Sequence, residues 1–189
     1  MKTLVLGAVA AALLHITPTV VLVKRQDAVA RLLPGADRFA ARELHLSSAD
    51  SRRLHDAVGW EPPDGVVTFY IGRRQDQVSG VLVFMRVDCQ HGPIELAIGY
   101  DPRGAIRGVE VTKATVEMKP WIVEALRAGL TEEYRGLAVG QSPSGAQKVK
   151  GHIGAMPEYM AELIDKGVMH ANAAYRLFYR SGAQIPPGM

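Results

Sequence analysis

The residues best suited to binding chemistry form two clusters of small side chains. Both clusters lie in a glycine-rich segment, residues 136–154, or at the start of the helix that follows it. One, residues 144–147, reads Ser-Gly-Ala-Gln, and the other, residues 153–156, reads Ile-Gly-Ala-Met. Small side chains let backbone amides approach an anion, and unpaired amides at the start of a helix favour phosphate. The same segment could also serve as a plain connector. The candidate binding residues are Ser144, Gly145, Ala146, Gly154, Ala155 and Met156.

Other catalytic and metal-binding patterns are weak in this sequence. It has none of the usual nucleotide-binding, serine-hydrolase or zinc-protease motifs. Cys89 is the single cysteine, which excludes a Cys-x-x-Cys pair and a haem attachment motif. Cys89 and His91 would face the same side of a strand as a metal pair, but no third ligand is nearby. Met169 and His170 lie off the apolar stripe of the last helix, so we expect them to be exposed or interfacial.

The first residues form an apolar run from Leu4 to Val23, flanked by Lys2 and by Lys24 and Arg25. About 20 apolar residues match a hydrocarbon core of roughly 30 Å, which predicts a membrane anchor over residues 1–24. A cleaved signal peptide is the alternative interpretation. His15 within the run is either a neutral side chain facing another helix or a ligand to a neighbour's haem or pigment.

Alternating apolar residues predict four successive strands. Residues 92–112 form a hairpin around the turn at 101–104, where Asp101, Pro102 and Gly104 each favour a reversal. Residues 66–71 and 78–87 form a second hairpin. Four strands joined by short turns predict an antiparallel sheet with one covered face.

Helical patterns surround the predicted sheet. Residues 27–43 are expected to be helical with a break at 34–35, and residues 51–58 and 121–128 are expected to be short helices. The last helix begins at Pro157 and carries an apolar stripe from Met160 to Phe178 that should cover the sheet. The fold class is therefore α+β: an N-terminal transmembrane helix, then a domain over residues 25–182, then a flexible tail over 183–189.

The segment from Gly80 to Leu137, with the hairpin at 92–112 and the short helix after it, resembles the FMN-binding domain of the Rnf-complex G subunit and of the sodium-pumping quinone reductase C subunit. Residues 34–39 and the apolar N-terminus are similar to that family as well. The resemblance implies a single-pass protein of the cytoplasmic membrane with its domain on the periplasmic, extracytoplasmic side. Its partners would be the lipid bilayer and other subunits of an electron-transfer complex.

Members of this family carry FMN on the threonine of a Ser-Gly-Ala-Thr motif before the last helix. Here Gln147 or Met156 stands at the threonine position. Neither has a hydroxyl, so this motif cannot form the phosphoester. Two functions remain open: an electron carrier that holds FMN noncovalently on the six candidate residues, or a cofactor-free interaction subunit of a membrane redox or photosynthetic complex. Neither is an independent enzyme, and the scattered basic residues argue against nucleic-acid binding.

Overall fold

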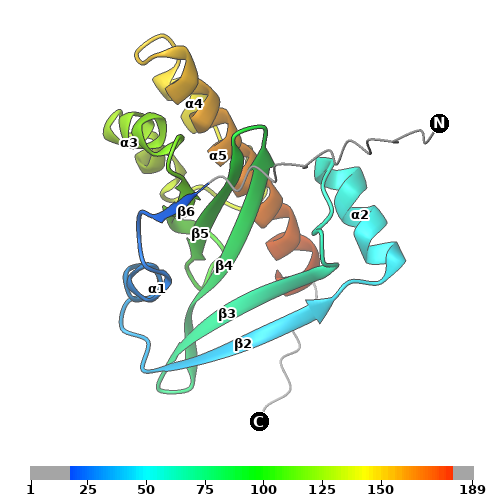
Figure 1. Ribbon diagram of the computed structural model, residues 1–189. Helices are drawn as coiled ribbons and strands as arrows, with labels where there is room; N and C mark the ends of the chain where they lie inside the picture. Colours follow the sequence, from blue (N-terminus) through cyan, green and yellow to red (C-terminus); the bar gives the residue numbers. More distant parts are fainter. Residues whose placement is uncertain (1–17, 181–189) are drawn as a thin grey trace, which may run out of the picture.

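A single antiparallel sheet of six strands organises the protein (Figure 1). The computed structural model describes residues 18–180. The strands lie in the order β1-β6-β5-β4-β3-β2. Neighbouring strands in the sheet are therefore consecutive in the sequence, except for β1 and β6. Their bounds are Thr19–Val21 (β1), Arg38–His45 (β2), Val66–Arg74 (β3), Gln77–Cys89 (β4), Gly92–Tyr100 (β5) and Ile106–Thr115 (β6).

Helices cover the two faces of the sheet unequally. The long helix α5 packs across β4 and β5 on one face, where α3 and α4 in turn pack against it, whereas α1 covers part of the opposite face (Figure 1). We call these the inner and the outer face. The helical elements are α1 (Arg25–Leu32), α2 (Ser48–Val58), α3 (Lys119–Arg127), η1 (Leu130–Tyr134), α4 (Gly145–Val149), α5 (Ala155–Ala174) and η2 (Tyr175–Arg180).

The predicted hairpin at residues 92–112 is confirmed as β5 and β6. The Asp101 carboxylate accepts hydrogen bonds from the amides of Arg103 and Ala105, at 2.8 and 2.9 Å. Gly104 has a φ of 86°, a conformation that costs glycine little. The second predicted hairpin is also confirmed, as β3 and β4. The α+β class and the covering of the sheet by the last helix are therefore as the sequence predicts.

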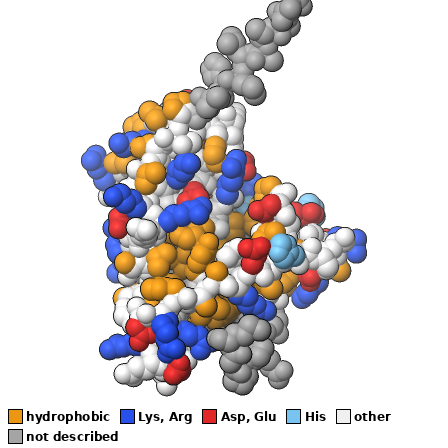
Figure 2. Space-filling view, turned by 60° about the horizontal axis from the view of Figure 1, so that its bottom comes forward, with side chains coloured by type: hydrophobic (Ala, Val, Ile, Leu, Met, Phe, Trp, Pro, Cys, Tyr) orange, Lys and Arg blue, Asp and Glu red, His pale blue; other side chains and the backbone are white. Residues whose placement is uncertain are grey.

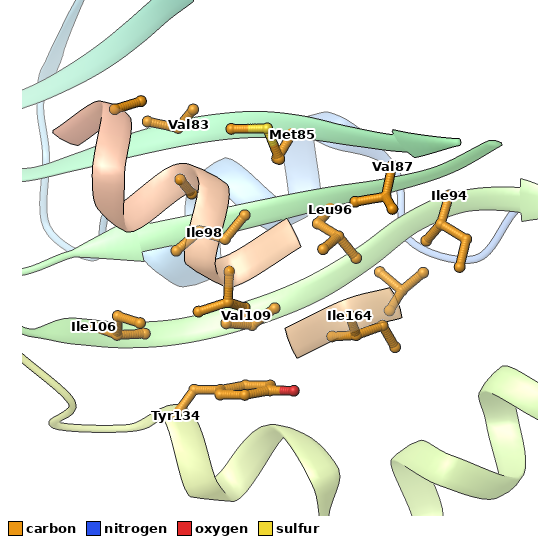
Figure 3. Close-up of a cluster of buried hydrophobic side chains, with 14 of the residues drawn as sticks. Val83, Met85, Val87, Ile94, Leu96, Ile98, Ile106, Val109, Tyr134 and Ile164 are labelled. Atoms are coloured by element: carbon orange, nitrogen blue, oxygen red, sulfur yellow. The ribbon is translucent and has the colours of Figure 1, made fainter. Parts of the chain in front are cut away.

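The inner face of the sheet and the helices above it form the main core. Apolar side chains from β4, β5 and β6 point toward α5, and Tyr134 of η1 closes one side (Figure 3). Helix α5 approaches closely at Gly167, because a Cβ there would lie 2.4 Å from Leu96 Cδ1 and 2.8 Å from Val87 Cγ2. A glycine at this position therefore sets the spacing between the helix and the sheet.

The prediction of helix over residues 27–43 is correct only at its start. Helix α1 ends at Leu32, and Arg38–His45 form strand β2, which pairs antiparallel with β3. Six of its eight residues, Arg38 to Ala41, Glu43 and His45, are exposed, so β2 lacks the apolar alternation that identifies half-buried strands. Pairing with β3 therefore determines its conformation.

The predicted anchor extends too far along the chain. Thr19–Val21 form β1 at the edge of the sheet, paired with β6, and the Leu22 amide donates to the Thr112 carbonyl at 2.9 Å. The end of the apolar run therefore belongs to the folded domain, and the prediction of one transmembrane helix from Leu4 to Val23 is wrong there. Within residues 18–180, no helix has the length and apolar character needed to cross a bilayer. His15 and the predicted tail lie outside the described residues.

Candidate functional site

The structure places both predicted glycine clusters at helix N-termini. Ser144 precedes α4, and Gly154 precedes α5, which packs against α4. Helix α4 was not predicted, because residues 136–154 contain many glycines and small polar residues that are typical of a loop. Gly145 is buried, whereas Ser144, Gly154 and Ala155 are exposed.

The amides of the first cluster already bind a carboxylate of the same chain. Asp165 of α5 accepts hydrogen bonds from the amides of Gly145 and Ala146, at 3.1 and 2.9 Å, and from the Tyr134 hydroxyl at 2.7 Å. Burial, and then the Asp165 carboxylate, raise the pKa of Tyr134 well above its usual value, so its hydroxyl stays protonated and donates. Asp165 thus joins α4, α5 and η1.

Packing explains the glycine at position 145. A Cβ on Gly145 would lie 2.7 Å from both Leu130 Cδ1 and the Tyr134 hydroxyl oxygen. The glycine therefore allows α4 to approach η1. It is required by the fold and needs no ligand to explain it.

The second cluster also lies among carboxylates. Glu124 Oε1 is 3.5 Å from the Gly154 amide, and Glu158 Oε1 accepts a hydrogen bond from the Gly151 amide at 2.6 Å. Pro157 has no N–H group, so the first turn of α5 has one amide fewer for an anion. The Met156 side chain is half-buried against the main core and has no hydroxyl.

An FMN phosphate does not fit either cluster as the chain is folded. A dianionic phosphate at Gly145 and Ala146 would have to displace Asp165, and one at Gly154 would lie beside Glu124 and Glu158. Like charges at such distances repel. A nearby cation, Lys148, is paired with Glu133 at 3.5 Å.

The Cys89 and His91 pair is held in contacts within the chain. Cys89 Sγ donates to the Gly92 carbonyl at 3.2 Å. The imidazole of His91 lies 3.2 Å from a Glu117 carboxylate oxygen and packs edge-on against Trp121. No cluster of three or more metal-ligating side chains occurs among residues 18–180.

A hollow that sequence reasoning missed lies where β3 and β4 diverge. The two strands pair from Phe69 and Val83 toward their connecting turn, and in the other direction they separate (Figure 1). The opening encloses about 640 Å³. Aromatic and charged side chains line it, among them Trp60, Tyr70, Phe84, Arg25, Arg86 and Asp88.

The two arginines of this hollow are already neutralised. Arg25 forms an ion pair with Glu95 and also lies over the Phe84 ring, 4.6 Å from its centre. Arg86 pairs with Asp88 at 2.7 Å. The hollow therefore offers an amphipathic surface with little net charge.

His170 lies buried against Trp60, contrary to the expectation that it is exposed or interfacial. Its side chain is 1% exposed and stacks on the indole of Trp60, with ring centres 4.8 Å apart. Neither ring nitrogen has a hydrogen-bond partner. Burial, and to a smaller extent the charge of Lys166, lower the pKa of His170 to about 4.

Acid is therefore expected to destabilise the protein through His170. The unfolded chain binds a proton there below about pH 6.5, whereas the folded chain resists protonation down to about pH 4. Stability falls through this window, by about 2 kcal/mol between pH 7 and pH 5. Urea unfolding at the two pH values measures the loss. His170→Phe keeps the stacked ring, so between pH 7 and pH 5 its folding stability should fall by about 2 kcal/mol less than that of the parent chain. An equal fall in both proteins would contradict this role of His170.

Comparison of the sequence with models of known protein families found no matching family, and comparison with curated proteins found no match.

Proposed function

We propose that this chain is a cofactor-free interaction subunit of a membrane redox or photosynthetic complex, working at the extracytoplasmic face of the membrane. The observation that carries this proposal is the carboxylate of Asp165 on the amides of Gly145 and Ala146. One of the two clusters that match the flavin-attachment motif of the resembling family, residues 144–147, is thus used here to join helices.

The alternative, noncovalent FMN on the same residues, has less support. It needs Asp165 to leave three donors, or the phosphate to lie beside Glu124 and Glu158. Either arrangement leaves a buried donor unpaired or brings like charges together, and both cost free energy.

The uncovered part of the outer face supports a role in contact with other proteins. Helix α1 leaves Tyr70 and Phe84 partly exposed, beside Trp60 and the hollow. Figure 2 shows one face of the molecule, on which hydrophobic side chains gather with basic and acidic side chains around them. Aromatic side chains with a charged border are typical of protein interfaces.

The apolar residues before β1 support export of the domain. The apolar run from Leu4 to Ile16 is 13 residues long, fewer than the about 20 residues needed to cross a bilayer. This length is typical of the apolar part of a signal peptide. In that case the other subunits of the complex hold the exported domain at the membrane.

The first test measures FMN binding. The full chain, produced together with a flavin-transferring enzyme, is purified by gel filtration, and the same protein is then titrated with FMN. We expect no visible flavin absorbance in the protein peak and no quenching of FMN fluorescence. Flavin bound at one per chain, before or after acid precipitation, would contradict the proposal.

The second test measures assembly in the source cells. The tagged full chain, extracted with mild detergent, is expected to co-purify in fixed ratio with integral membrane subunits whose cofactors absorb visible light. Recovery of the chain free of any such subunit would contradict the proposal. N-terminal sequencing of the recovered chain distinguishes a cleaved signal peptide from a retained anchor.

A further inference from the structure

Strand β2 has an open edge. On one side it pairs with β3 along its whole length, and it is the last strand of the sheet. No other described segment pairs with its second side. An open edge of this length can pair with another strand.

The register of β2 identifies which backbone groups point outward. The Leu46 amide, just after the strand, donates to the Gly65 carbonyl at 2.8 Å, so Leu46 points toward β3. Along an antiparallel strand, the backbone N–H and C=O groups of successive residues point alternately to one side and to the other. The N–H and C=O groups of Phe39, Ala41, Glu43 and His45 therefore point toward the open side.

Three successive residues in the first half of this edge are uncharged. Phe39, Ala40 and Ala41 follow one another, and all three are exposed, with 55% of Phe39 accessible to solvent. The two alanines have short side chains, so another strand can approach the backbone here without steric hindrance.

Symmetry leaves few ways to pair β2 with β2 of a second copy. In an antiparallel pair about a two-fold axis, the side chains of opposite residues lie on the same face of the sheet. The axis must therefore pass midway between one residue and the same residue of the second copy. The registers that overlap most of the strand are centred on Ala40, Ala41, Arg42 or Glu43.

Charge selects one of these four registers. Centring on Ala40 places Arg38 opposite Arg42, and centring on Arg42 or Glu43 places two like charges directly opposite each other. Such pairs destabilise a sheet.

Centring on Ala41 avoids every such pair. It places Ala41 opposite itself, Phe39 opposite Glu43 and Arg38 opposite Leu44.

We propose that the protein forms a two-fold dimer in which β2 pairs with β2 of a second copy, centred on Ala41, and the two sheets become one. About six main-chain hydrogen bonds form between Phe39, Ala41 and Glu43 and their opposite residues. The dimer is independent of the proposed function, since it uses neither the glycine clusters nor the hollow.

Cysteine cross-linking tests the register. In the Ala41-centred pair the two Ala41 Cα atoms lie about 5.5 Å apart, within the range that a disulfide spans. Ala41→Cys is therefore expected to form a covalent dimer under mild oxidation. Ala40→Cys is the matched control, because its two copies lie roughly 8 Å apart, too far for a disulfide. The unsubstituted chain reports any background from Cys89.

A mixture of Phe39→Cys and Glu43→Cys chains provides a second measurement of register. The mixture should cross-link, whereas each variant alone should not. Equal cross-linking of Ala40→Cys and Ala41→Cys, or none in Ala41→Cys, would overturn the proposal.

Sedimentation tests the dimer without cysteines. At about 50 µM the full chain is expected to sediment as a dimer and Ala41→Pro as a monomer. The Ala41 amide points away from β3, so proline at this edge position blocks pairing with the second copy and keeps the bond pattern with β3. Equal urea unfolding of Ala41→Pro and the parent chain, measured where both are monomeric, checks the fold. A parent chain that is monomeric at 50 µM would overturn the proposal.

Discussion

Replacing Gly167 with leucine is expected to cost about 3 kcal/mol of folding stability or more. Even the Cβ of the new side chain would fall within 2.4 Å of Leu96 and 2.8 Å of Val87. Both residues are buried strand residues of the main core, so neither can move into solvent. Helix α5 must then move away from the sheet, which opens its contact with β4 and β5.

Urea unfolding of Gly167→Leu measures this loss. Glu162→Leu is the matched control, because Glu162 is an exposed residue of the same helix and receives the same new side chain. We expect the control to lie within about 0.5 kcal/mol of the parent chain. Equal stability of the two variants would mean that Gly167 does not set the distance between α5 and the sheet.

Replacing Asp165 with alanine is expected to cost about 2–4 kcal/mol. The substitution removes a carboxylate that accepts three hydrogen bonds, from the Tyr134 hydroxyl and the amides of Gly145 and Ala146. Tyr134 is fully buried, so its hydroxyl cannot donate to water in place of the lost carboxylate. Helix α4 is short and depends on this carboxylate for its N-terminal amides, so we expect α4 to lose order first.

Urea unfolding gives the total loss for Asp165→Ala, and amide hydrogen exchange at residues 145–149 reports the order of α4. Glu158→Ala is the matched control, because Glu158 is also a carboxylate of α5 but accepts one hydrogen bond, at 2.6 Å, from the exposed amide of Gly151. It should cost about 1 kcal/mol or less. A smaller loss for Asp165→Ala than for Glu158→Ala would contradict the joining role of Asp165.

The two central hairpins and the last helix could be predicted from local sequence. The turn at residues 101–104 carries its own aspartate, proline and glycine, and the apolar alternation on either side identifies the buried faces of β5 and β6. The stripe from Met160 to Phe178 likewise shows which face of α5 meets the sheet. These features depend on residues close together in the chain, so a single sequence carries enough information to find them.

Strands β1 and β2 could not be predicted in this way. The residues of β1 end an apolar run that is equally typical of a membrane segment, and β2 has exposed residues on both faces. Each becomes a strand because a distant strand, β6 or β3, offers it hydrogen bonds. Local propensity is weaker than such pairing.

By itself, the sequence determined that no hydroxyl stands at the threonine position of either glycine cluster, because Gln147 and Met156 occur there. Only the tertiary structure decided what the amides of the first cluster bind, since Asp165 lies 20 residues after Gly145 in the sequence and reaches it only because α5 packs beside α4. It likewise decided that His170 is buried, because Trp60 comes from a separate loop that packs over α5. Contacts between distant segments determine such sites, and a local pattern does not contain them.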